Sequence, residues 1–177
     1  MKPLDPRQRA AAEELISNEW PKLERFFRTK VPPADILDLA QTTCLAYVER
    51  LDEVKSNPRG YLWAIARKQL LKHWDRSRAR GAATFDSSQH SLQDVGPSLS
   101  SAIGRRSRLL DALQSLPADQ QMAIELRYGE GLTLEETADA IGVSLATVKR
   151  YLLAAEETLR TTVGASTEAT ADEYRRT

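Results

Sequence analysis

The stretch LTLEETADAIGVSLATVKRYLLAAEETLR, residues 132–160, decides the fold of the C-terminal half of the chain. Thr133 and Glu136 have the T-x-x-E spacing of a capping box, which marks the start of a helix. Gly142 lies four residues after Ala138, where the turn between two crossing helices favours a positive φ angle. Ser144 is placed to cap a second helix. The pattern predicts a helix-turn-helix with helices at about 134–141 and 145–162.

A helix-turn-helix binds DNA by placing the N-terminal end of its second helix in the major groove. Polar side chains at that end can bond base edges or phosphates. The candidates are Ser144, Thr147, Lys149 and Arg150. A packed helical hairpin without a DNA role is the alternative, which the small residues and the two capping signals make the weaker interpretation.

The rest of the chain also has the apolar spacing of helices. Three helices are expected at about 8–29, 34–50 and 58–79, with Pro21 as a potential kink, and two more at about 105–115 and 117–129. Residues 81–104 contain six Ser, three Gly and no Lys or Arg, the composition of a flexible linker. The predicted fold is all-α. It has a three-helix domain at 8–80, a four-helix domain at 105–163 and a disordered tail at 164–177.

The positive charge of the chain is concentrated in one segment. The chain has 25 basic and 25 acidic residues, yet residues 54–80 contain eight Lys or Arg and one Asp. Lys68, Lys72 and Arg76 follow one another at steps of four, and Arg59, Trp63 and Arg67 form a second row. Cations along a helix, together with aromatic rings on which bases stack, are typical of proteins that bind single-stranded nucleic acid. The alternative is a solvated charged face with tryptophans packed in the core.

Several functional classes are disfavoured by what the sequence lacks. Cys44 is the single cysteine, so an internal disulfide or a multi-cysteine zinc site is excluded. His73 and His90 have no partners at catalytic or metal-ligand spacing, and no Gly-rich phosphate loop is present. We therefore expect no enzymatic activity, no cofactor and no metal. With no apolar run of about 18 residues, we expect a cytoplasmic protein without membrane insertion.

Four segments, in order, resemble the extracytoplasmic-function (ECF) sigma factors, small two-domain initiation subunits of bacterial RNA polymerase. They are WPKLERFF, DLAQTTCLAY, NPRGYLWAIARKQLLKHW and SLPADQQMAIELRYGEGLTLEETADAIGVSLATVKRYL. The resemblance covers about residues 10–160. It implies an alternative sigma factor that directs the polymerase core to promoters, reading the −35 duplex and the melted −10 strand.

The resemblance also implies roles for individual residues. Contacts with core polymerase are expected from Asp38, Leu39, Gln41 and Thr42. The loop at about 54–59 would hold a flipped base. The residues expected to contact the −10 strand are Asn57, Arg59, Tyr61, Trp63, Arg67, Lys68, Lys72 and Arg76. The −35 duplex would be read by Ser144, Thr147, Lys149 and Arg150.

The chain departs from the family pattern at three positions. Thr42 stands where the family commonly has Glu, and Thr43 follows it; Lys68 and Lys72 replace a usual Asn and a usual Asp. Phosphorylation of Thr42 or Thr43 by a Ser/Thr kinase would restore negative charge, since a phosphate adds about −1.5 to −2 at neutral pH. A neutral substitution without a regulatory role is the alternative.

Two other functions remain open at this stage. One is a helix-turn-helix transcriptional regulator that does not act as a sigma subunit. The other is a factor that keeps the polymerase contacts but has lost promoter opening. The expected partners are RNA polymerase core and promoter DNA, with an anti-sigma factor or a Ser/Thr kinase as candidate regulators.

Overall fold

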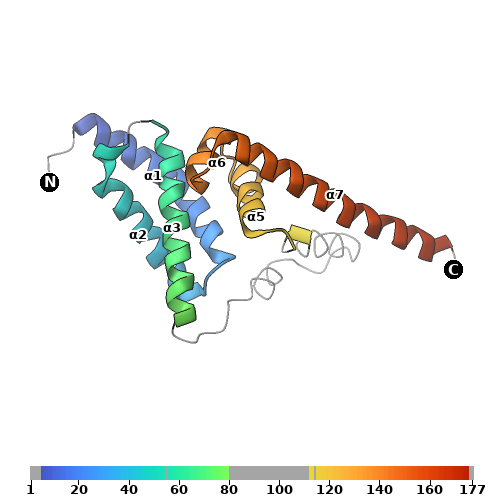
Figure 1. Cartoon of the computed structure of the whole chain (residues 1–177). Helices are drawn as coiled ribbons and strands as arrows, with labels where there is room; N and C mark the ends of the chain where they lie inside the picture. Colours follow the sequence, from blue (N-terminus) through green and yellow to red (C-terminus); the bar gives the residue numbers. More distant parts are fainter. Residues whose placement is uncertain (1–4, 55, 80–111, 114, 176–177) are drawn as a thin grey trace. The chain divides into compact units, whose positions relative to one another are not determined.

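The structure, a computed structural model, describes residues 5–54, 56–79, 112–113 and 115–175, with side chains of the last helix up to residue 161. These residues form helices and turns, which confirms the all-α fold. They divide into two compact units, one built on α1–α3 and the other on α5, η3 and α7 (Figure 1). The predicted linker at 81–104 and most of the predicted helix at 105–115 lie outside the described residues.

The first unit has three helices, each close to its predicted position. Helix α1 spans Pro6–Arg28 and continues through Pro21; its cap is Asp5, whose Oδ1 accepts the N–H of Arg7 at 3.2 Å. Helix α2 spans Pro33–Glu49 and is followed by a short 3-10 turn, η1, at Leu51–Glu53. Helix α3 spans Pro58–Ala79. Helices α2 and α3 both begin with proline, which lacks the N–H that the first turn would leave unbonded.

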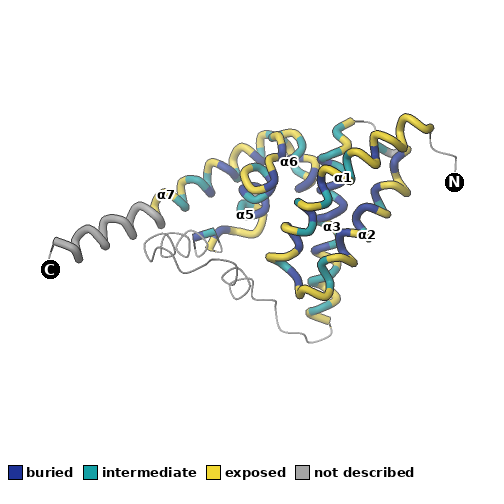
Figure 2. The backbone as a smooth tube through the Cα atoms, turned by 180° about the vertical axis from the view of Figure 1, so that it is seen from behind, coloured by how far each residue is buried: buried dark blue, intermediate teal, exposed yellow. Residues whose placement is uncertain are grey.

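The core of the first unit lies where α2 packs against both α1 and α3. Figure 2 shows the buried positions recurring along one side of each helix. The buried apolar side chains are Ala12, Leu23, Phe26, Phe27, Val31, Leu39, Ala40, Cys44, Tyr47, Leu51, Leu62, Trp63, Ile65, Ala66 and Leu70. Near the C-terminal end of α3, Trp74 connects this helix to the turn between α1 and α2, because its Nε1 donates to the carbonyl oxygen of Lys30 at 3.1 Å.

The second unit is also helical. Helix α5 spans Ala118–Ile124 and continues into a π-helical turn, η3, at Glu125–Gly129, so that together they cover the helix predicted at 117–129. The chain then reverses. The N–H of Leu132 bonds the carbonyl of Leu126 at 3.0 Å, and Gly131 adopts φ +67°, a value that glycine reaches without steric cost. Helices α6, Leu134–Ile141, and α7, Leu145–Arg175, follow.

Helix α7 is longer than expected. It runs to Arg175, through residues 164–175 that the sequence analysis assigned to a disordered tail. The segment contains no proline and includes Ala165, Ala169 and Ala171. Alanine has the highest helix propensity, so the chain can continue the helix although few apolar residues are present to anchor it.

Candidate nucleic-acid interface

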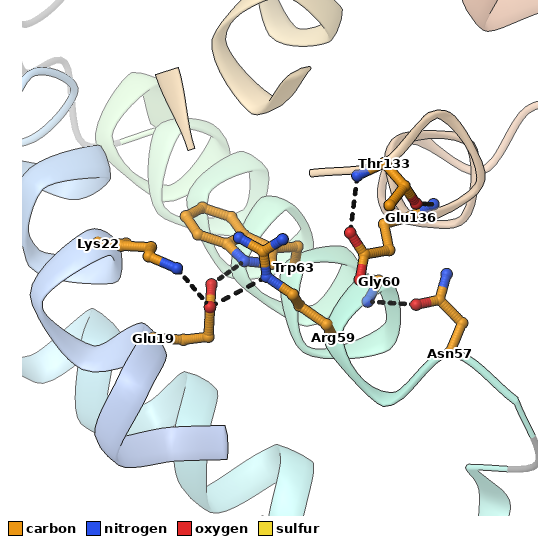
Figure 3. Close-up of polar contacts among 8 residues, drawn as sticks. All are labelled: Glu19, Lys22, Asn57, Arg59, Gly60, Trp63, Thr133 and Glu136. Atoms are coloured by element: carbon orange, nitrogen blue, oxygen red, sulfur yellow. Dashed lines mark hydrogen bonds and ion pairs between the residues drawn. The ribbon is translucent and has the colours of Figure 1, made fainter. Parts of the chain in front are cut away.

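The local geometry of the helix-turn-helix follows the sequence prediction. Both bonds of the capping box form: the Thr133 N–H donates to Glu136 Oε2 at 2.7 Å, and the Glu136 N–H donates to Thr133 Oγ1 at 3.1 Å (Figure 3). Gly142 has φ +79°, and its N–H bonds the carbonyl of Ala138 at 2.8 Å. Ser144 caps α7 by accepting the Thr147 N–H at 3.2 Å. These features are confirmed.

The first turns of α7 present polar groups on one side and apolar groups on the other. Val148 is fully buried, while Lys149 and Arg150 are exposed. Thr147 is half-buried; its Oγ1 lies 2.9 Å from Ser144 Oγ and accepts a bond from Arg150 Nη2 at 3.3 Å. The hydroxyls and the guanidinium thus form one connected polar surface at the helix start, as a DNA-reading end requires.

Further along α7 the charge changes sign. Tyr128 donates its hydroxyl to Glu156 Oε1 at 2.6 Å, and this bond raises the pKa of the tyrosine above its usual value. Glu157 is exposed on the next position. Carboxylates repel phosphate, so this part of the helix is unsuited to DNA contact.

In the first unit, α3 carries an exposed row of cations. Lys68, Lys72 and Arg76 are all exposed, one turn apart, and Arg67 is half-buried beside them. Because the opposite side of α3 is buried in the core, the row is fixed on a rigid element. Tyr61 is partly exposed near the start of the helix, with its ring 6.3 Å from that of Tyr47.

The structure corrects the expected position of Trp63. Its side chain is 1% exposed and meets the Phe26 ring edge-to-face, with centroids 5.3 Å apart and planes at 89°. The indole Nε1 donates to Glu19 Oε2 at 2.9 Å. No face of the ring is open for a base to stack on, so the prediction that Trp63 belongs to an exposed aromatic row is wrong. The alternative of tryptophans packed in the core applies to this residue.

Glu19 is the residue that the sequence analysis missed. It lies on α1, 3% exposed, and two hydrogen-bond donors and one ion-pair partner from α1 and α3 converge on its carboxylate (Figure 3). Besides Trp63, Lys22 Nζ lies 2.6 Å from Oε1, and Arg59 Nε lies 3.0 Å from the same oxygen as an ion pair without the alignment of a hydrogen bond. Arg59 is therefore held against α1, and the structure removes it from the exposed row where it was expected.

The surroundings of Glu19 set its ionisation. Burial alone would raise the pKa of the carboxyl, but the contacts with Lys22, Trp63 and Arg59 and the charge of Arg59 outweigh it, so the pKa lies below the ordinary 4.5. The ionised carboxylate is the form that fits the site.

The lowered pKa predicts acid sensitivity of the first unit. Above the unfolded pKa of 4.5 the carboxylate contributes its full stabilisation, and as the pH falls through the lower folded pKa this contribution is lost. We expect the free energy of unfolding to fall below about pH 4.5 by more in the wild type than in Glu19→Gln, which has no proton to bind there. Urea titrations at several pH values measure this free energy. An equal fall at low pH in both proteins would contradict the lowered pKa of Glu19.

The start of α3 has an unusual backbone. Asn57 adopts φ +57°, a left-handed conformation that asparagine tolerates better than most residues. Its Oδ1 accepts the N–H of Gly60 at 3.1 Å (Figure 3), and its carbonyl accepts the N–H of Tyr61 at 3.1 Å. Asn57 is therefore the N-cap of α3. Lys55, in the loop expected to hold a flipped base, lies outside the described residues.

Helix α2 presents an apolar surface to solvent. Leu37, Leu45 and Val48 are exposed, Leu45 by 64%, and they alternate with the exposed polar side chains of Asp38 and Gln41. We call the surface formed by these five residues the α2 face. Large apolar side chains gathered on an exposed helix are typical of a surface that binds another protein.

Two of the residues predicted on α2 lie on its buried side. Leu39 is 7% exposed and packs in the core, so its expected contact with polymerase is wrong for this structure. Thr43 is fully buried, and its hydroxyl donates to the Leu39 carbonyl at 2.7 Å. A kinase cannot reach that hydroxyl, which removes Thr43 as a phosphorylation site. Thr42 is half-buried at the edge of the α2 face.

Cys44 and His73, two other described residues with reactive side chains, lie in or beside the packed core. Burial raises the pKa of the Cys44 thiol, which keeps it protonated and unreactive. His73 Nε2 lies 3.8 Å from Asp35 Oδ2, a contact between α3 and α2. Among the described residues, no group of three or more His, Cys, Asp or Glu could hold a metal ion. In the same part of the chain, no helix is long and apolar enough to cross a membrane.

Comparison with known proteins agrees with both halves of this description. The family model for sigma-70 region 2 matches residues 9–80, and that for sigma-70 region 4 matches residues 106–159. The chain is 30% identical over 151 residues to the RNA polymerase sigma-E factor of Streptomyces avermitilis, covering 84% of this chain and 82% of the relative. It is 30% identical over 159 residues to the ECF RNA polymerase sigma factor SigF of Caulobacter vibrioides, covering 85% and 87%.

Two solved structures share the fold. One is the sigma factor RpoE in complex with the anti-sigma factor NepR from Bartonella quintana, with a TM-score of 0.64 and 22% identity over 86% of this chain and 96% of the other. The second is CnrH in complex with the cytosolic domain of CnrY, with a TM-score of 0.59 and 20% identity over 89% and 90%.

Taken with the helix-turn-helix and the cationic helix, these matches define a two-part helical transcription factor. The chain belongs to the ECF sigma factors of the sigma-70 family. It is an alternative sigma factor, which directs the RNA polymerase core to promoters. The matches to both regions disfavour a helix-turn-helix regulator that does not act as a sigma subunit. The family consists of initiation subunits, which implies that the chain is not an enzyme.

Proposed function

We propose that the exposed side of α3 holds the melted −10 strand of the promoter. Lys68, Lys72 and Arg76 form the phosphate track, with Arg67 beside them and Tyr61 as the partly exposed ring near the helix start. Asn57 belongs to the loop that receives a flipped base. The observation that supports this most strongly is the row of three exposed cations on a helix fixed by its buried opposite side.

The start of α7 supplies the second DNA contact in this proposal. Thr147, Lys149 and Arg150 read the −35 duplex, and Ser144 positions them by capping the helix. Two separate DNA contacts, one for unpaired strand and one for duplex, fit the two compact units. Since polymerase and chromosome are cytoplasmic in bacteria, the protein acts in the cytoplasm.

The α2 face is the proposed docking surface for core polymerase, with Asp38 and Gln41 at its polar positions, Thr42 at its edge, and Leu37 and Leu45 as apolar anchors. The solved relatives RpoE and CnrH were each determined with a protein partner, NepR and CnrY. We propose an anti-sigma factor as a regulator of this chain too, in competition with polymerase.

The proposal is tested by a pull-down of core polymerase with the full chain, followed by run-off transcription from the recovered holoenzyme. We expect tight binding to core and transcription that depends on the added chain. The variant in which Lys68, Lys72 and Arg76 are all glutamine should bind core normally and transcribe poorly. Full transcription by this triple variant would contradict the phosphate track. Failure of the wild-type chain to bind core would contradict the docking surface.

Thr42 is the proposed phosphorylation site. Its side chain is half-buried beside Asp38, and a phosphate there would add about −1.5 to −2 charges to the α2 face. We expect Thr42→Glu to initiate transcription more strongly in cells than Thr42→Ala, which cannot be modified. Thr43→Val, a change at the buried neighbour, is the control and should leave the response to the kinase intact. Transcription by Thr42→Ala at the wild-type level would rule out the switch.

A further inference from the structure

Arg59 lies at the start of α3, close to the phosphate track, but its side chain is paired with a carboxylate of α1. It is the second residue of α3, next to the N-terminal end, where the helix dipole favours anions. A cation at that place would extend the phosphate track toward the loop. Its side chain is instead 20% exposed and paired with the carboxylate of Glu19.

The carboxylate of Glu19 is the anion that pairs with Arg59, in the place where a DNA phosphate would otherwise bind. It is 4% exposed at the side chain, and it is fixed by the Trp63 indole and the Lys22 ammonium as well as by Arg59. A DNA phosphate reaching Arg59 would have to compete with a carboxylate that is already desolvated and held by two other donors. Breaking a buried pair is costly, because it leaves an uncompensated charge behind.

We infer that Glu19 is a specificity-determining residue of the sigma factor: it withdraws Arg59 from the phosphate track and so lowers the sequence-independent affinity of α3 for single strands. The inference rests on the proposed role of α3. With Arg59 withdrawn, the residue that meets the strand at the start of the helix is Asn57, a neutral cap in the loop proposed to hold a base. Contacts with phosphate position a strand, whereas contacts with bases specify it.

The salt dependence of binding measures this directly, because each phosphate neutralised on a single strand contributes about 0.7 to the slope of log affinity against log salt. The probe is a fluorescent oligothymidylate, and the protein is the full chain, folded as judged by circular dichroism. We expect the slope of Glu19→Gln to be steeper than that of the wild type by about 0.7, with severalfold tighter binding at low salt. Glutamine keeps the size of the side chain and an acceptor for the Trp63 N–H.

Two further variants distinguish an effect of freeing the Arg59 side chain from an effect of destabilising the first unit as a whole. The double variant Glu19→Gln with Arg59→Gln should return to the wild-type slope, and Arg59→Gln alone should not change it. An unchanged slope in Glu19→Gln would overturn the inference. So would a slope lowered by about 0.7 in Arg59→Gln alone, since Arg59 would then already contact phosphate. A lowered slope in Arg59→Gln would overturn the inference even if Glu19→Gln does not fold.

The triple glutamine variant of Lys68, Lys72 and Arg76 tests the underlying track separately. It should lower the slope by about 2, three contacts at about 0.7 each. If this variant leaves the slope unchanged, the proposed function of α3 is wrong. If it lowers the slope while Glu19→Gln has no effect, the track stands and only the role of Glu19 fails.

Discussion

Trp63→Ala will destabilise the first unit by about 3–5 kcal/mol, the range found when a large buried aromatic side chain is removed. The indole is fully enclosed, its edge-to-face contact with Phe26 is lost, and Glu19 loses one of its two hydrogen-bond donors. Since typical domains are stable by only about 5–15 kcal/mol, the change removes a large share of the total. Unfolding in urea, followed by circular dichroism, measures it.

The matched control is Trp63→Phe, which keeps most of the ring volume and loses the N–H. We expect an intermediate loss of about 1.5–3 kcal/mol, the usual contribution of a hydrogen bond to a charged group. The three tryptophans, at positions 20, 63 and 74, all lie in the first unit, so fluorescence of the remaining two reports on that unit alone. A Trp63→Ala protein as stable as the wild type would show that the ring is not part of the core.

Leu45→Asp will weaken binding to core polymerase by at least about 100-fold. The leucine is 64% exposed on the α2 face, so the substitution leaves the fold of the free protein almost unchanged. In the proposed complex the side chain is covered, and burying an unpaired carboxylate costs several kcal/mol, where about 1.4 kcal/mol corresponds to tenfold in affinity. Titration of labelled protein with core polymerase gives the dissociation constant.

The same substitution at Leu71 is the control. Leu71 is an exposed leucine of the same unit, but it lies on α3. We expect Leu71→Asp to bind core within about threefold of the wild type, as surface substitutions away from an interface usually cost less than about 0.5 kcal/mol. Equal losses at both positions would mean that α2 is not the principal docking surface.

Local signals were sufficient to predict the helices and the turn of the helix-turn-helix. The Thr133–Glu136 capping box, Gly142 and the Ser144 cap each act through neighbouring backbone groups, so their effect can be read from a few consecutive residues. The bounds of α1, α2, α3 and α6 follow the predicted ones for the same reason.

The position of Trp63 could also have been found from the sequence. At 3.6 residues per turn, residues seven apart are almost two full turns apart and share a face. Trp63 precedes the buried Leu70 by seven residues, whereas Lys68 and Lys72 lie on the other side. Both rows advance in steps of four, so what separates them is the face on which each begins: Arg59 and Trp63 lie toward the core, whereas Lys68, Lys72 and Arg76 lie on the exposed face.

Other features were beyond local reasoning. Helix α2 is apolar on two sides, so the pattern alone could not say that Leu39 faces the core and Leu45 faces solvent. The role of Glu19 depends on an indole 44 positions away in the chain. A charged residue in an amphipathic helix is normally solvated, and only the packing of α1 against α3 reveals this one as buried.

The central claim is that exposed cations of α3, and not the Trp63 ring, hold the opened promoter strand. Permanganate reactivity of thymines in the −10 region, measured on a promoter transcribed by the reconstituted holoenzyme, tests it most directly. We predict wild-type reactivity for Trp63→Phe at a temperature where it is folded, and loss of reactivity for the triple glutamine variant of Lys68, Lys72 and Arg76. Retained reactivity in the triple variant, or its loss in folded Trp63→Phe, would contradict the claim.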